Sequence, residues 1–311
     1  MIRLLQAYNT ILSVAFVFFL GFLIGKVYFN LSVKLLSKLS IWLFATTVNF
    51  VYLNDNPIPL KMFLTLIISN LLILTLIFLS WIIIGGFCKH TLLNFLITAF
   101  SNTGYIGYPI FYGLFGEKGL GYAVAFSIPH SFILATLGVA VLSLSTKEKF
   151  SKDLIKGAVK VFKMPWIYAI ALAAFFNWLG ISWRDFPPFL KGFIDMLKSA
   201  SIPMILLTVG IEMSRVTFSM KFLKKVGFNT VFKLFIAPAI SVPFVFLFGF
   251  DNLMSKIFIL QFAMPTAVNS AIIAADQNVE PEYASFTVFS TTVFSFLSLG
   301  FWIWLIEKLG V

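Results

Sequence analysis

Long apolar runs follow one another along almost the whole chain, and only short polar stretches separate them. Each run is close to the roughly 20 residues that an α-helix needs to cross the hydrocarbon core of a bilayer. The pattern therefore predicts an all-α integral membrane protein with ten transmembrane helices. The predicted spans cover about 8–28, 36–53, 63–87, 92–114, 119–145, 164–183, 188–213, 223–250, 254–275 and 283–306.

Composition excludes the main soluble alternatives. Hydrophobic residues make up 60% of the 311 residues and charged residues only 11%, whereas charged residues make up about 25% of a soluble domain. A soluble fold could not cover so much apolar surface with so few charges, so we exclude a secreted disulfide protein, a disordered protein and a cytosolic enzyme. The single cysteine, Cys88, rules out an internal disulfide and a multi-cysteine metal site. We expect neither a bound metal nor a cofactor.

Basic residues predict the orientation of the chain. The net charge of +11 would suggest nucleic acid as a partner of a soluble protein, but here it is better explained by the excess of Lys and Arg in cytoplasmic loops. Most of the 23 Lys and Arg residues fall on one side of the predicted spans, together with the 146–163 connection. We therefore expect this connection in the cytoplasm, both termini outside, and the chain in the plasma (inner) membrane, among lipid and without nucleic acid.

The same connection divides the chain into two halves of five predicted spans. Because five is odd, the two halves must enter the membrane with opposite topology, which is the signature of an inverted repeat. We predict a first five-helix repeat at 1–145, a cytoplasmic connection at 146–163 and a second five-helix repeat at 164–311. Phe100 and Phe262 support this division weakly, because each stands just before an interruption in corresponding spans, the fourth and the ninth.

The two interruptions combine polar residues with helix breakers. The fourth span contains Ser101-Asn102-Thr103-Gly104-Tyr105-Ile106-Gly107-Tyr108-Pro109, and the ninth contains Met264-Pro265-Thr266-Ala267-Val268-Asn269. Glycine and proline disfavour a continuous helix, and broken backbone is tolerated in a membrane only beside protein or a wet cavity. We therefore predict that helices four and nine are broken and cross each other. Two simple proline kinks are the alternative.

Crossed broken helices would form a binding site for an anion. Each half-helix N-terminus carries roughly +0.5 charge and free N–H groups, which suit a carboxylate. Neither interruption contains an acidic residue, and its amides and hydroxyls can supply neutral hydrogen bonds. The candidate substrate-binding residues are Asn102, Thr103, Gly104, Tyr105, Pro109, Pro265, Thr266, Asn269 and Ser270.

These two interruptions resemble those of the auxin efflux carrier (AEC) family of transporters. Weaker similarities are Ser201-Ile202-Pro203 with Gly210 in the seventh span and Trp302-Ile303-Trp304 at the end of the tenth. The resemblance implies the fold of the bile-acid/sodium-symporter-like superfamily, with helices four and nine crossing, and elevator-type transport. It also implies organic anions as substrates: indole acids in plants, and malate or similar carboxylates in bacteria. A homodimer is one of the assemblies that this leaves open.

Two ionisable residues inside predicted spans are candidates for coupling or gating. His130 in the fifth span could take part in transport, or it could be a neutral histidine bonded to a helix carbonyl. Lys233 in the eighth span could pair with an anion, or its long side chain could extend to the cytoplasmic face. No acid lies at either interruption, so a coupling ion could be held only by backbone carbonyls and Asn side chains.

The sequence leaves three possible functions. The leading one is a secondary transporter that exports small organic anions, which the membrane potential could drive by about 2.3 kcal/mol per charge at 100 mV. A proton- or sodium-coupled symporter, or a membrane receptor on the same fold, are the alternatives. We expect no enzyme, because the sequence contains none of the familiar intramembrane catalytic motifs and only two histidines.

Overall fold

The computed structural model describes residues 2–146 and 150–310. Among these residues all regular structure is helical, apart from one isolated antiparallel bridge. The α-helices are α1 (Ile2–Val27), α2 (Val33–Leu39), α3 (Thr46–Asp55), α4 (Leu60–Gly85), α5 (Lys89–Ala99), α6 (Gly107–Ile133), α7 (Val139–Ser143), α8 (Phe150–Phe162), α9 (Pro165–Trp178), α10 (Pro188–Met213), α11 (Leu223–Val231), α12 (Ala237–Leu247), α13 (Asn252–Ala263), α14 (Val268–Asp276) and α15 (Pro281–Leu309). The π-helical turns are η1 (Ser40–Ala45), η2 (Leu134–Gly138) and η5 (Phe232–Ile236), and the 3-10 turns are η3 (Trp183–Asp185) and η4 (Met220–Phe222).

Seven helical stretches among the described residues are long and apolar enough to cross a membrane, or eight if the bent pair α8–α9 counts as one span. This confirms an all-helical integral membrane protein. One of the seven, at 107–143, is 37 residues long, or about 55 Å at 1.5 Å per residue, although the hydrocarbon core is only about 30 Å thick. It breaks at Gly116, whose φ of 66° is incompatible with a continuous helix. The ten-span inverted repeat stays a prediction, since the fourth and ninth predicted spans consist of shorter helices.

The predicted connection between the two halves is mostly helical. Residues 147–149 lie outside the described residues, and α8 follows them before a bend of 60° into α9. A Cβ atom at Gly157 would lie 2.2 Å from the carbonyl oxygen of Ala135 in η2. Only glycine therefore allows α8 to pack so closely against η2, which places this connection beside the interior of the fold.

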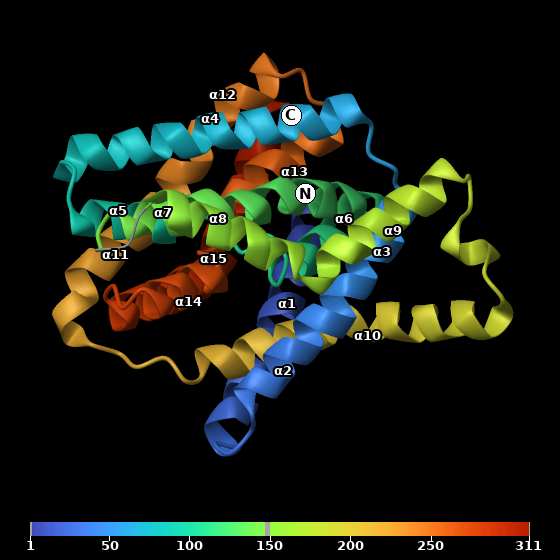
Figure 1. Ribbon diagram of the computed structural model, residues 1–311, viewed down its shortest axis with the longest axis horizontal. Helices are drawn as coiled ribbons and strands as arrows, with labels where there is room; N and C mark the ends of the chain where they lie inside the picture. The colour runs from blue at the N-terminus through green and yellow to red at the C-terminus, as the bar shows by residue number, and fades with distance from the viewer. Residues whose placement is uncertain (1, 147–149, 311) are drawn as a thin grey trace.

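The helices pack in two groups. In the first group α1 packs on α10 and η1 joins α10, and α3 packs on α9 (Figure 1). A Cβ at Gly21 would lie 2.4 Å from the Leu207 carbonyl oxygen, so only glycine allows α1 and α10 this close approach. In the second group α4 packs on α5, α13 on α6 and α12, and α14 and α11 on α15. The start of α1 and the end of α15 line one surface cavity with Gln6 and Glu307, so both ends of the chain lie on the same face.

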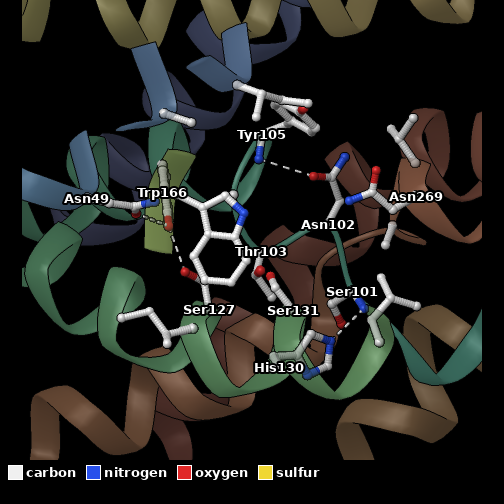
Figure 2. Close-up of a pocket in the computed structure, with 18 of the residues that line it drawn as sticks. Asn49, Ser101, Asn102, Thr103, Tyr105, Ser127, His130, Ser131, Trp166 and Asn269 are labelled. Atoms are coloured by element: carbon white, nitrogen blue, oxygen red, sulfur yellow. Dashed lines mark hydrogen bonds between the residues drawn. The ribbon is translucent and has the colours of Figure 1, made fainter. Parts of the chain in front are cut away.

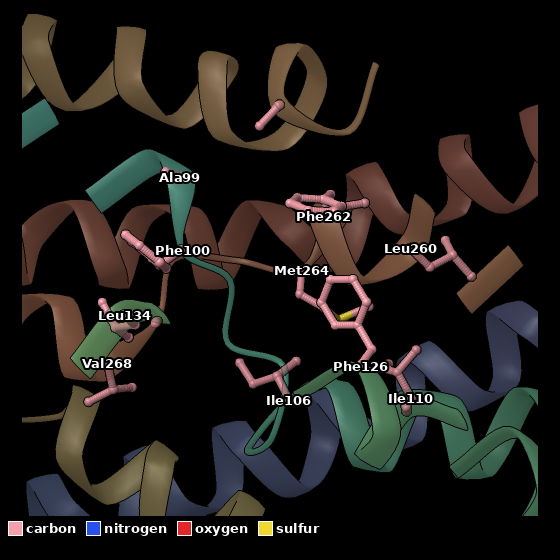
Figure 3. Packing of buried hydrophobic residues seen from close by; sticks show 14 of the residues in the cluster. Ala99, Phe100, Ile106, Ile110, Phe126, Leu134, Leu260, Phe262, Met264 and Val268 are labelled. Carbon is pink, nitrogen blue, oxygen red and sulfur yellow. The ribbon is translucent and has the colours of Figure 1, made fainter. Parts of the chain in front are cut away.

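Aromatic residues form part of the buried core around Phe262 of α13 (Figure 3). The ring of Phe262 lies 5.4 Å from those of Phe126 and Phe258, at steep angles. Phe100 and His130 stand 5.5 Å apart, centroid to centroid. Edge-to-face aromatic contacts of this kind stabilise a rigid core. Two chain segments far apart in sequence are thereby held together at this point.

Candidate functional site

The two interruptions predicted from the sequence meet in space. One lies between the end of α5 at Ala99 and the start of α6 at Gly107, and the other between α13 and α14. Ser101 and Thr266 pair as the isolated antiparallel bridge. The Asn102 N–H donates to the carbonyl oxygen of Pro265 at 2.7 Å, and the Ala267 N–H donates to that of Phe100 at 2.9 Å. The two broken segments therefore cross and hydrogen-bond each other; we call this place the crossing.

Local sequence explains why the helices stop at the crossing. Phe100 and Met264 have extended backbone where α5 and α13 end, and a residue before proline, such as Met264, avoids the helical region. In the segment between α5 and α6, Asn102 forms a turn: its Oδ1 accepts the Tyr105 N–H at 3.1 Å, and its carbonyl accepts the Gly107 N–H at 3.1 Å. Asparagine side chains commonly cap turns in this way. The interruptions are therefore well-defined, hydrogen-bonded structures rather than simple kinks.

Side chains donate to three of the carbonyls at the C-terminal ends of α5 and α13. The last four carbonyls of a helix lack intrahelical donors. For α5, the Thr266 hydroxyl donates to the Ile97 carbonyl at 2.6 Å and the Ser270 hydroxyl to the Leu96 carbonyl at 3.1 Å. For α13, the ammonium group of Lys233 donates to the Phe262 carbonyl at 3.0 Å. Each of these donors comes from another segment of the chain, so they bind the crossing together.

A buried histidine fixes the backbone of the crossing. His130 Nε2 accepts the Ser101 N–H at 2.9 Å, and His130 Nδ1 lies 2.8 Å from Asn70 Oδ1. Because a backbone N–H can only donate, Nε2 carries no proton, and the proton on Nδ1 donates to Asn70. The Asn70 amide in turn donates to the Leu66 carbonyl at 2.8 Å. His130 is therefore neutral, and its partners are a backbone amide and an asparagine rather than the predicted helix carbonyl.

A cavity of about 150 Å³ adjoins the crossing (Figure 2). Its size matches an engineered protein cavity that binds benzene. No acidic residue lines it, among the part of the chain that the structure describes. The Asn102 Nδ2 atom is buried and has no hydrogen-bond partner there, and the amide of Asn269 also faces the cavity. The polar residues that line it are Asn49, Ser101, Asn102, Thr103, Tyr105, Tyr108, Ser127, His130, Ser131 and Asn269.

A second cavity, of about 550 Å³, continues from the first toward one surface. The two share Trp166 and Asn269 in their linings. The far end of the second cavity is lined by Lys160 and Asp276, which form an exposed ion pair with an N–O distance of 3.5 Å. The cavity at the crossing therefore adjoins a larger cavity on the side of the fold that carries α8.

The structure brings together some of the residues predicted from sequence and gives others different partners. Five line the cavity: Asn102, Thr103, Gly104, Tyr105 and Asn269. Thr266 and Ser270 do not line the cavity. Their hydroxyls instead donate to carbonyls at the end of α5, which have no donors within the helix. Pro265 supplies a carbonyl to Asn102, and Pro109 lies in the first turn of α6, where a missing N–H costs nothing.

The two ionisable candidates occupy different positions at the crossing. His130 lines the cavity. Lys233 is 0% exposed and donates to Ser101 Oγ at 2.7 Å, so it lies directly behind the cavity wall. The alternative in which Lys233 extends to the cytoplasmic face is therefore wrong: its nitrogen is held at the crossing by two acceptors.

Several residues of the site were missed by the sequence reasoning. The Tyr108 hydroxyl donates to Asn49 Oδ1 at 2.8 Å and lies 2.6 Å from the Ser127 hydroxyl, so three segments meet beside the cavity. Trp166 places its indole across the cavity (Figure 2). One signal could have pointed to this region: Asn49 and Asn70 are polar residues within otherwise apolar spans. A polar residue in such a span is expected to face the protein interior.

Comparison with known proteins agrees with this architecture. The sequence matches the membrane transport protein family over residues 6–303. An uncharacterized transporter of Methanocaldococcus jannaschii is 25% identical over 213 residues, which are 68% of this chain and 67% of the relative. An uncharacterized transporter of Methanothermobacter thermautotrophicus is 27% identical over 209 residues, 66% of this chain and 64% of the relative, so the chain spans about two thirds of the length of both. Since the family match covers nearly the whole chain, the protein belongs to the membrane transport proteins of the auxin efflux carrier (AEC) family.

Proposed function

We propose that this transporter is an efflux carrier of small organic anions, such as carboxylates, and that the anion binds in the cavity at the crossing. The observation that carries this proposal is the Asn102 amide nitrogen, a buried donor that faces the cavity without a partner. A buried donor left unpaired costs about 1–3 kcal/mol, and a carboxylate oxygen would satisfy it. The absence of acidic residues from the described lining of this cavity favours an anion over a cation.

Two positive features support an anion at this place. The N-terminus of the nine-residue helix α14 reaches the cavity at Val268 and Asn269. The first turn of a helix presents N–H groups and partial positive charge to an anion. The Lys233 nitrogen lies one hydrogen bond behind the wall, through Ser101. A small mono- or dicarboxylate would therefore meet neutral donors directly and a positive charge at short range.

The cavity size and its opening suggest how the carrier works. A cavity that matches a benzene-sized guest suits small carboxylates better than large ones. If the 146–163 connection is cytoplasmic, the second cavity beside α8 would face the cytoplasm. The structure would then represent the inward-facing state of a carrier made of two five-helix repeats. Movement of the group with α5, α6, α13 and α14 against the group with α1 and α10 would then be the elevator-type step.

The function is tested with the purified full-length chain. Its melting temperature should rise in the presence of one or more small carboxylates in a panel of mono- and dicarboxylates, because binding to the folded state stabilises it. Proteoliposomes should then take up the same labelled compound with a rate that follows the imposed membrane potential. A ligand that stabilises the protein but is never transported would instead identify a receptor, and a panel without any effect would overturn the organic-anion proposal.

The orientation can be tested by cysteine labelling. Cys88 is exposed, and hydrogen bonds from the side chain and backbone of Thr91 lower the pKa of its thiol, so it reacts readily and must first be replaced by serine. In that background, Ser151→Cys on α8 should resist a membrane-impermeant maleimide added to intact cells and react after permeabilisation. Asn252→Cys, at the start of α13, serves as the control and should react in intact cells. The reverse pattern would show that α8 is outside.

A further inference from the structure

An apolar groove lies on the surface of the first group of helices, between η1, α3, α9 and α10. Its volume is about 380 Å³. The side chains of Trp42, Tyr168 and Phe193, which line it, are each more than half exposed. Thr46 and Thr47 also line it, but their hydroxyls donate to carbonyls of the preceding turn at 2.8 Å. The groove therefore offers mainly hydrocarbon surface, and an exposed apolar surface of this kind indicates a binding partner.

A single cation stands where this groove begins along α9. Lys163 is the one charged residue among the described residues that line the groove, and it is exposed. None of the ion pairs between described residues includes Lys163. An apolar groove with a cation at one end is complementary to a molecule that has a hydrocarbon chain and an anionic head. Lipids of the surrounding bilayer have this chemistry.

The length of the groove matches one leaflet of a bilayer. Along α9 its lining runs from Lys163 to Leu172, which is about 14 Å at 1.5 Å per residue. Half of the hydrocarbon core of a bilayer is about 15 Å. An acyl chain in the groove would therefore stay within one leaflet, and its headgroup would lie at Lys163.

The helix α8 places Lys163 at the level of the lipid headgroups. With 13 residues α8 is about 20 Å long, which is too short to cross the bilayer, and it bends by 60° into α9. It has an exposed apolar face, formed by Ile155, Val159 and Phe162. It also has a stripe of basic residues at every fourth position, Lys152, Lys156 and Lys160. A short helix with such faces lies in the plane of the membrane interface, and Lys163 follows it directly.

We propose that the groove binds one anionic phospholipid of the leaflet beside α8, with an acyl chain along α9 and α10 and the phosphate group at Lys163. A zwitterionic phospholipid has a similar chain but no net charge to offset that of Lys163, so the site prefers anionic headgroups. The groove lies on the first group of helices and shares no lining residue with the cavity at the crossing. The proposal is therefore independent of the substrate proposed above.

The first arm of the test removes the charge and reads lipid binding by native mass spectrometry. The delipidated full-length protein in detergent receives phosphatidylglycerol and phosphatidylcholine with identical acyl chains at equal concentration. The wild type should bind one phosphatidylglycerol about fivefold more tightly than phosphatidylcholine. Lys163→Gln should lose this preference. Lys224→Gln, at an exposed lysine of α11, is the matched control and should keep it. A wild type without the preference, or an unchanged preference in Lys163→Gln, would overturn the proposal.

The second arm fills the groove and leaves the charge in place. Leu172→Trp puts a larger side chain at a half-exposed position of the lining, so the bound phosphatidylglycerol should be lost. Leu72→Trp, at a similarly exposed position of α4, is the control and should bind the lipid normally.

Melting temperatures show whether each variant is folded, and phosphatidylglycerol should raise that of the wild type more than that of Leu172→Trp. The mass spectra also report the oligomeric state. A dimer that forms as the lipid is displaced would show that a second copy of the chain occupies the groove, and it would overturn the proposal. Unchanged lipid binding by a folded Leu172→Trp protein would overturn it as well.

Discussion

Replacing Asn102 by aspartate should abolish measurable binding of a transported carboxylate, and replacing it by alanine should weaken binding by about 1–3 kcal/mol. The Asn102 Nδ2 atom is the unpartnered donor of the cavity, so alanine removes a hydrogen bond to the anion. Aspartate adds a like charge beside the anion in a poorly screened site, where repulsion is strong. Asn269→Ala, on the facing segment, should weaken binding by a similar amount. Titration calorimetry on the purified variants measures these affinities.

The affinities of these variants can be interpreted only if the crossing stays folded. Asn102 also accepts the Tyr105 N–H, so each variant's melting temperature has to be measured beside its affinity. Asn9→Ala, an exposed asparagine near the start of α1, is the control for loss of an amide elsewhere. If Asn102→Ala, Asn102→Asp and Asn269→Ala remain folded and bind the carboxylate with unchanged affinity, the anion site lies elsewhere.

Replacing His130 by leucine should lower the stability of the protein more than any other single change at the crossing. Leucine leaves two buried groups unpaired, the Ser101 N–H and Asn70 Oδ1, each worth about 1–3 kcal/mol. His130→Gln can keep a hydrogen bond to one of these groups and should lose less. The free energy of unfolding, from denaturant titration in detergent, distinguishes the two variants.

His130 should adjust transport rather than anchor the anion. Protonation of Nε2 would require the Ser101 N–H bond to break, so only strong acidification should reduce transport through the geometry of the crossing. We expect that His130→Gln still binds the carboxylate and that its transport rate depends less on pH than the wild type's. Complete loss of binding in a folded His130→Gln protein would mean that the histidine contacts the substrate.

Hydrophobic patterning was enough to predict an all-helical chain with long apolar helices, of which seven or eight among the described residues could cross a membrane. The predicted ends at 114 and 119 fall on either side of Gly116, where the long 107–143 stretch breaks. The breaks after Phe100 and Met264 were also predictable, because proline, glycine and asparagine act through local backbone preferences. Features that depend on neighbours in sequence could therefore be predicted.

Features that depend on distant partners could not. The hydroxyl of Thr266 donates to a carbonyl 169 residues away, so nothing near it in the sequence distinguishes a helix cap from a substrate ligand. The inward direction of Lys233 depends on a π-helical turn and on Trp302 of another helix. Hydropathy treats such a lysine as one that reaches the membrane surface. Long-range packing of this kind decides which polar residues in a span face the site.

The position of a bound anion tests the central claim most directly. Anomalous scattering from crystals of the protein with a bromine-substituted carboxylate, chosen from the compounds that stabilise it, would locate that anion. We predict bromine density in the cavity of about 150 Å³, with a carboxylate oxygen about 3 Å from Asn102 Nδ2 and close to Asn269. An anion bound outside this cavity, with the Asn102 amide nitrogen still unpaired, would contradict the account.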